Sequence, residues 1–173
     1  GIRAIGSSDN PVGADQILIL TELGFTHIWN MPSRSRLQLE GGDNNDTHAS
    51  HGADGSGNGG VPDTETFNPH QQTQGFASSF AWGYRMVVLG SYENVLPNVG
   101  IHPTLIFSQD VQGISPGPAF EFVGGRKEID TLYEFRYKAS LSLNLGYTWY
   151  WGGGDQNMLS DRDFAQAFVK YQF

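Results

Sequence analysis

The residues best suited to binding chemistry lie in a polar segment between positions 54 and 65. Counted from Asp54, oxygen-bearing residues stand at positions 1, 3 and 5, a glycine at 6, a backbone carbonyl at 7 and a glutamate at 12. A hard cation such as Ca²⁺ prefers several oxygen ligands on a tight turn, and EF-hand loops use this spacing. The segment therefore predicts a calcium site, the one cofactor that the sequence suggests, with candidate ligands Asp54, Ser56, Asn58, Gly60 and Glu65.

The alternative for this segment is a solvated loop that binds no metal. Chance produces such spacing where Asp, Gly and Asn are abundant, no flanking helices are apparent, and Pro62 occupies a usually polar position. The nearby pair His48 and His51 could bind zinc or copper together with a carboxylate, but in a surface loop such a pair is usually only solvated. Both features belong to the long polar loop 31–79, whose composition predicts that it cannot bury enough apolar surface to order itself.

Charged residues of both signs form a second candidate site. They alternate along residues 126–136, and those of residues 80–94 join them on the same predicted face. Inside a wide barrel such side chains line a water-filled path and set its selectivity, whereas in a narrow barrel they pair across strands. Both possibilities stay open for these candidate lumen-lining residues: Arg85, Glu93, Arg126, Glu128, Asp130, Glu134 and Arg136.

The composition argues against several other functions. A net charge of −8 with ten Lys and Arg residues argues against nucleic-acid binding, which needs a clustered basic surface. The chain has no cysteine, which excludes disulfides and thiolate metal sites. No set of Ser, His and acid residues is suggested by position, so we expect no enzymatic activity.

These candidate residues must be positioned by β-strands, because apolar residues recur with a period of two. The clearest apolar stripe runs from Ala139 to Trp151, where small or polar residues occupy the intervening positions. The predicted strands have about the length of 9–11 residues that crosses a bilayer when a strand is tilted, or slightly more. The pattern predicts six strands: residues 16–29, 80–94, 99–110, 126–137, 139–151 and 164–173.

Three features favour a membrane barrel over a soluble β-sandwich, whose strands also alternate. The apolar stripes end in aromatic residues such as Trp149 and Trp151, as at a membrane interface. The opposite faces carry charges of both signs. Short connections at 95–98 and near Lys138 contrast with long ones at 31–79, 111–125 and 152–163. The sequence therefore predicts an all-β fold, an antiparallel up-and-down transmembrane β-barrel with short periplasmic turns and long extracellular loops.

Several motifs carry a resemblance to a known family. Phe173 follows Val169 and Tyr171 on one strand face, which looks like the C-terminal signal that the assembly machinery of outer-membrane barrels recognises. Over residues 14–173 the chain resembles the C-terminal part of a large family of proteobacterial outer-membrane proteins whose biochemical role is undefined. The supporting motifs are, in order, AWGYR at 81–85, DVQG at 110–113, SPGP at 115–118, GGRK at 124–127, YTW at 147–149 and DRDF at 161–164.

The resemblance implies a location in the bacterial outer membrane, in contact with outer-membrane lipid. It further implies a periplasmic partner and an efflux-type inner-membrane transporter, and thus movement of a hydrophobic or lipid-like compound. We therefore expect a channel or conduit. The first alternative is a structural or partner-binding barrel with a plugged lumen, and the second is an outer-membrane hydrolase.

Six strands cannot close a bacterial barrel, because these barrels start at about eight strands and hydrocarbon does not tolerate unpaired strand edges. We expect residues 1–173 to be the C-terminal portion of a single barrel domain. Either further strands precede Gly1, which is the expectation we favour, or several chains contribute to one barrel.

Overall fold

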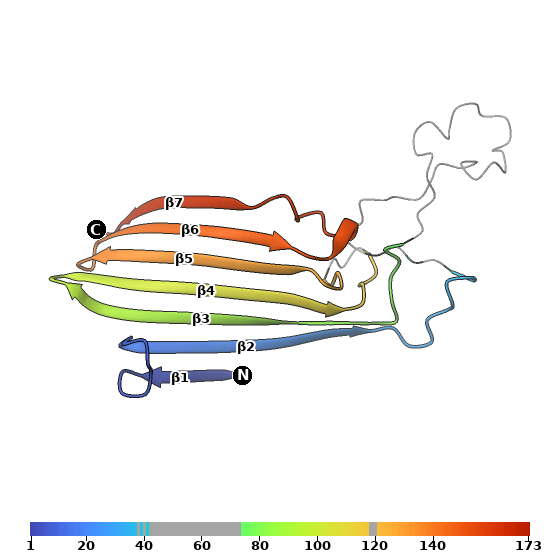
Figure 1. The fold of residues 1–173 in the computed structure, drawn as a ribbon, viewed down its shortest axis with the longest axis horizontal. Coiled ribbons are helices and arrows are strands. Elements are labelled where there is room, and N and C mark those ends of the chain that lie inside the picture. Colours follow the sequence, from blue (N-terminus) through green and yellow to red (C-terminus); the bar gives the residue numbers. More distant parts are fainter. Residues whose placement is uncertain (38, 40, 42–73, 118–120) are drawn as a thin grey trace, which may run out of the picture.

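The computed structural model describes residues 1–37, 39, 41, 74–117 and 121–173. These residues form one antiparallel sheet of seven strands, in which every strand pairs with its neighbours in sequence (Figure 1). A short 3₁₀ helix, η2 (Gly154–Gln156), precedes the last strand. The strands are β1 (Ile2–Gly6), β2 (Gln16–His27), β3 (Phe80–Leu96), β4 (Val99–Gln112), β5 (Lys127–Tyr137), β6 (Leu141–Trp151) and β7 (Phe164–Tyr171).

The prediction of six strands is wrong by one. β1 is only five residues long and pairs with β2 from Ile2 opposite Leu20 to Gly6 opposite Gln16. It was missed because so short a segment does not show a sustained alternation of polar and apolar residues. The six predicted strands are all present, and the sheet is all-β and up-and-down as expected. Within the described chain the sheet is not closed, since β1 and β7 each pair on one side only.

Strand register divides the side chains between two faces of the sheet. We call the face that carries Arg85, Ser108, Glu128 and Ser142 the polar face, and the opposite one, with Leu143 and Trp149, the apolar face. Successive residues of a strand point to opposite faces, so the register assigns all other side chains in the same way.

On β6, burial on the two faces is the reverse of that in a soluble sheet. Leu143 and Trp149 on the apolar face of β6 are 42% and 41% exposed, whereas Asn144 and Thr148 on its polar face are 1% and 0% exposed. The small polar side chains are buried because they lie between larger neighbours: Asn144 is opposite Glu134 and Phe168. The hydrophobic effect in water would select the opposite arrangement.

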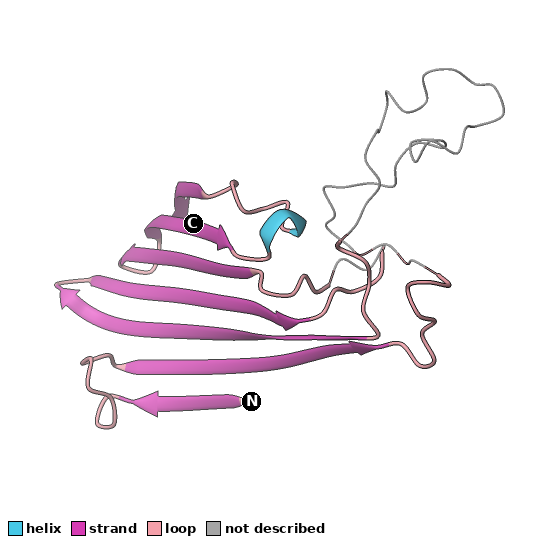
Figure 2. Ribbon diagram, turned by 45° about the vertical axis from the view of Figure 1, so that its right-hand side comes forward, coloured by secondary structure: helices cyan, strands magenta, loops and turns pink. Residues whose placement is uncertain are grey.

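The connections alternate in length, as predicted. At one end of the sheet two residues join β3 to β4, and the turn from β5 to β6 begins at Lys138, whose φ is 53°. Residues 7–15 join β1 to β2 at this end, where the Asn10 side chain donates to the carbonyls of Gly6 and Ala14. The connections 28–79, 113–126 and 152–163 lie at the other end, which we call the long-loop end (Figures 1 and 2).

The best-buried apolar side chains are mostly found at the long-loop end. Phe76, Ala77 and Val123 are at most 3% exposed there. Backbone hydrogen bonds join the loops, from Ala77 N–H to the Leu39 carbonyl at 2.8 Å and from Ser78 N–H to the Ile114 carbonyl at 2.9 Å. The expectation that loop 31–79 cannot order itself is therefore wrong for its described flanks, because they pack against other loops. No helix in the described part is long and apolar enough to cross a membrane.

A substitution among the packed loops of the long-loop end, which we call the loop layer, tests whether their buried side chains stabilise the fold. Val123→Ala removes two methyl groups from a side chain that is 1% exposed, and we expect it to lower the free energy of unfolding by about 2 kcal/mol. Urea unfolding of the intact protein measures the change. Val95→Ala is the matched control, because Val95 is 43% exposed and its truncation leaves no cavity. Equal effects of the two changes would contradict a packed loop layer.

Candidate functional site

The candidate charged residues gather on the polar face in two groups. Near the long-loop end, the register aligns Glu22, Arg85, Ser108 and Glu128 in one row across β2 to β5, which we call the charged row. The opposite end of the sheet, with the turns from β3 to β4 and from β5 to β6, is called the short-turn end. There Glu134 and Arg136 of β5 lie on the same face, with Glu93 of β3 and His102 of β4 beside them. Asp130 stands between the two groups.

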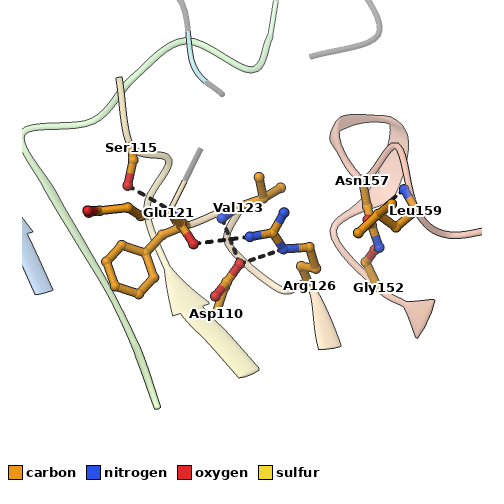
Figure 3. Close-up of polar contacts among 9 residues, drawn as sticks. Asp110, Ser115, Glu121, Val123, Arg126, Gly152, Asn157 and Leu159 are labelled. Atoms are coloured by element: carbon orange, nitrogen blue, oxygen red, sulfur yellow. Dashed lines mark hydrogen bonds and ion pairs between the residues drawn. The ribbon is translucent and has the colours of Figure 1, made fainter. Parts of the chain in front are cut away.

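An ion pair anchors the loop between β4 and β5. The Asp110 carboxylate lies 2.8 Å from Arg126 Nε, and both side chains are largely buried, with exposed fractions of 14% and 17% (Figure 3). The same Asp110 oxygen accepts the Val123 N–H at 2.9 Å. The two backbones are also bonded, from Asp110 N–H to the Arg126 carbonyl and from Gly125 N–H to the Asp110 carbonyl. Charge-assisted bonds of this kind are stronger than neutral ones, so the loop is tightly held.

The end of the β4–β5 loop, from Glu121 to Arg126, lies over the polar face and also contacts β2. Arg126 Nη2 donates to the Glu121 carbonyl at 3.0 Å, and the Phe122 N–H donates to Ser115 Oγ at 3.1 Å (Figure 3). On the far side, Thr26 Oγ1 of β2 donates to the Glu121 carboxylate at 2.7 Å. We call residues 121–126 the crossing segment, because these contacts reach from the β4–β5 junction to β2.

Two glycines make room for the Phe122 ring. Gly24 and Gly83 face each other across β2 and β3 on the polar face. A Cβ atom at either position would lie 3.1 Å from a carbon of the Phe122 ring, closer than ordinary van der Waals contact, and at Gly83 it would also lie 2.6 Å from the Gln109 carbonyl oxygen of β4. The sequence shows two isolated glycines in strands, and their role becomes clear only once the ring of a distant loop is placed over them.

A cavity of about 390 Å³ lies between the crossing segment and the wall of the sheet. This is within the usual size range of small-molecule sites, and its lining mixes charged, aromatic and backbone groups. Within the described chain, Arg85 forms no ion pair with a carboxylate. The residues that matter most for its shape and charge are Glu22, Gly24, Gly83, Arg85, Phe122 and Glu128.

Members of the short-turn group lie close to one another, and two of them form an ion pair. Arg136 Nη2 lies 2.8 Å from the Glu134 carboxylate, and His102 Nε2 lies 3.6 Å from Glu93. Ser91 Oγ also donates to Glu93, at 3.0 Å. In the middle of the sheet, Thr148 Oγ1 donates to the Asp130 carboxylate. The structure thus shows structural pairing at this end, while Arg85 and Glu128 stand in the open charged row.

Sequence reasoning missed an apolar strip on the polar face. Leu20, Val87 and Ile106 are aligned directly beside the charged row, and the next row adds Leu18, Leu89 and Leu132. We call these six residues the inner apolar strip. The only signal was that β2 is apolar on both faces, because the strip appears only when four strands are placed in register.

The predicted metal ligands cannot be located. Asp54, Ser56, Asn58, Gly60 and Glu65 lie outside the described residues, as do His48 and His51. Among the residues that the structure does describe, no group of three or more His, Asp or Glu could hold a metal ion.

Comparison with known proteins identifies the family. Residues 3–173 match the family described as "Protein of unknown function (DUF1302)". The chain belongs to this family. No curated protein and no solved structure matches the chain. Because the DUF1302 description assigns no activity, the function has to be argued from the geometry of the sheet and its loops.

The anchoring role of Asp110 is open to a direct test. Asp110→Asn keeps the side-chain size but removes the charge that holds Arg126 and the Val123 N–H, so we expect exchange of the Val123 amide to become about tenfold faster. Hydrogen–deuterium exchange of peptides covering 121–126 measures this. Asp130→Asn, the same change in mid-sheet, should leave these peptides unaffected. Unchanged exchange in Asp110→Asn would show that other contacts hold the crossing segment.

Proposed function

We propose that the chain forms part of a transmembrane β-barrel in the bacterial outer membrane, and that this barrel is a conduit for a hydrophobic or lipid-like compound. The observation that carries the proposal is the reversed burial, with apolar side chains exposed across one face of the sheet and the small polar side chains of β6 buried on the other. Water penalises such an arrangement, whereas hydrocarbon outside and a polar lumen inside stabilise it.

The aromatic residues of the apolar face support this orientation. Near the long-loop end, Tyr84, Phe107 and Trp151 follow one another with ring centroids 5.8 Å and 6.4 Å apart. Near the short-turn end, Tyr137 and Tyr171 lie on the same face and flank Leu141 in the register. Aromatic rings at both ends of an aliphatic band are typical of the two interfaces of a membrane barrel.

The proposed barrel also accounts for the free edges of β1 and β7. Their unpaired N–H and C=O groups would be costly in hydrocarbon, where no water is present to satisfy them. In the proposed barrel both edges pair with further strands, either of the same protein or of additional copies. Phe173, packed edge to face against Tyr171 at 5.3 Å, is then the residue offered to the barrel-assembly machinery.

The lining supports passage of a compound with apolar parts. A water-filled pore needs only polar walls, but here the inner apolar strip lies directly beside the charged row. The periplasmic and inner-membrane partners that the resemblance implies would supply or receive such a compound. In this proposal the charged residues select and bind, and none has a catalytic role.

A scaffold barrel with a plugged lumen is the second candidate. It is supported by the ion pair of Arg136 with Glu134 and by the crossing segment lying over the polar face. In that case the interior groups only stabilise one another, and the long loops would bind a partner.

The orientation of the two faces is tested by fluorescence. The intact protein with Trp149 as its only tryptophan is placed in liposomes of phospholipids brominated in their acyl chains. Because Trp149 lies on the apolar face, we expect strong quenching by the brominated lipid and weak quenching by aqueous acrylamide. A matched variant carries its only tryptophan at the neighbouring position, as Tyr150→Trp, and should show the reverse. Equal quenching of the two variants by acrylamide would contradict the proposed orientation.

Transport is tested in Gram-negative cells that express the intact protein. We expect faster entry of the apolar dye N-phenyl-1-naphthylamine than in cells without it. Val87→Asn places an amide in the inner apolar strip and should slow this entry roughly fivefold, since apolar contact with the dye is lost. Val95→Asn, on the same strand but outside the strip, is the control. Entry no faster than in cells without the protein would favour the scaffold.

A further inference from the structure

The crossing segment 121–126 has a role that neither the fold nor the general conduit proposal assigns. We infer that Phe122 forms the narrowest part of the conduit and so determines the width of the compounds that pass. This inference rests on the proposed conduit function and adds the residue that gives it specificity.

Phe122 lies on the lumen side of the proposed barrel. Gly24 and Gly83 lie two residues from Glu22 and Arg85 on their strands, and so share the polar face with the charged row. Both glycines lie directly beneath the Phe122 ring. The ring therefore projects over the interior wall, at the level where the long loops begin.

The ring is held from both sides. Toward β4 and β5, the Asp110–Arg126 pair and the Arg126 bond to the Glu121 carbonyl fix the backbone next to it. Toward β2, the Glu121 carboxylate accepts the hydroxyl of Thr26. The Ser115 hydroxyl fixes the Phe122 amide itself. A segment anchored on β2 and at the β4–β5 junction has to pass over the polar face of β3, which lies between them. An aromatic ring with only two side-chain torsions keeps a defined width there.

The position of the Phe122 ring determines the order in which a compound meets the surfaces of the conduit. A compound entering from the long-loop end first passes the Phe122 ring and then reaches the charged row, and both line the cavity of about 390 Å³. Two residues further along the strands it meets Leu20 and Val87 of the inner apolar strip. The narrow point is thus placed ahead of the apolar surface, where it can exclude wide compounds before they bind.

The experiment measures the pore diameter of the intact protein in a planar lipid bilayer, using polyethylene glycols of graded size. A polymer that fits into the pore lowers its conductance, and a larger one does not. We expect Phe122→Ala to admit larger polymers and to raise the unit conductance roughly twofold. Phe122→Trp should lower both. Phe168→Ala, which removes a ring from the polar face of β7 outside the cavity, should change neither.

One-sided addition locates the narrow point. Polymers of intermediate size should be excluded from the long-loop side but should enter partway from the short-turn side, and Phe122→Ala should abolish this difference. Conductance that appears only in Phe122→Ala would also support the inference, since the ring would then close the pore. A conducting protein whose polymer cut-off is the same without substitution and in all three variants would overturn the inference. The proposed conduit function would then still stand. No conductance in any of them would overturn both.

Discussion

The register of the antiparallel sheet is the constraint on which the other features depend. Because side chains alternate along each strand, a shift of one residue between two strands would move every side chain of the shifted strand to the other face. Pro103 in β4 has no N–H to donate, and Gly90, opposite it in β3, provides the space for its ring: a Cβ at Gly90 would lie 2.9 Å from Pro103 Cγ. This matched pair favours the observed register at the centre of the sheet.

The register has two consequences for the polar face. It aligns Glu22, Arg85, Ser108 and Glu128 from four strands into one row, and it places the inner apolar strip next to that row. Neither arrangement exists in a single strand. The surface is therefore amphipathic along the strand direction, while the sheet as a whole is amphipathic between its faces. A conduit for a compound with apolar and polar parts uses both properties.

The loops add a second layer of order to this sheet. The buried Asp110–Arg126 pair joins the end of β4 to the start of β5, and the loop between them folds back over the polar face. A buried ion pair stabilises only when its geometry is good and its remaining groups are bonded. Here the Val123 N–H and the Glu121 carbonyl provide those bonds, and Val123 is itself among the best-buried apolar residues of the long-loop end.

Local alternation was enough to find six of the seven strands, the two faces and the alternating connection lengths, because these depend only on near neighbours in sequence. β1 was missed, since five residues carry too little pattern, and the packing of Phe76 against other loops was not foreseen. The sequence placed Arg126 among the lining residues but could not pair it with Asp110. The tertiary structure alone decided that pairing, the alignment of the inner apolar strip and the packing of the Phe122 ring on Gly24 and Gly83. Each of these features depends on contacts between residues that are far apart in the chain.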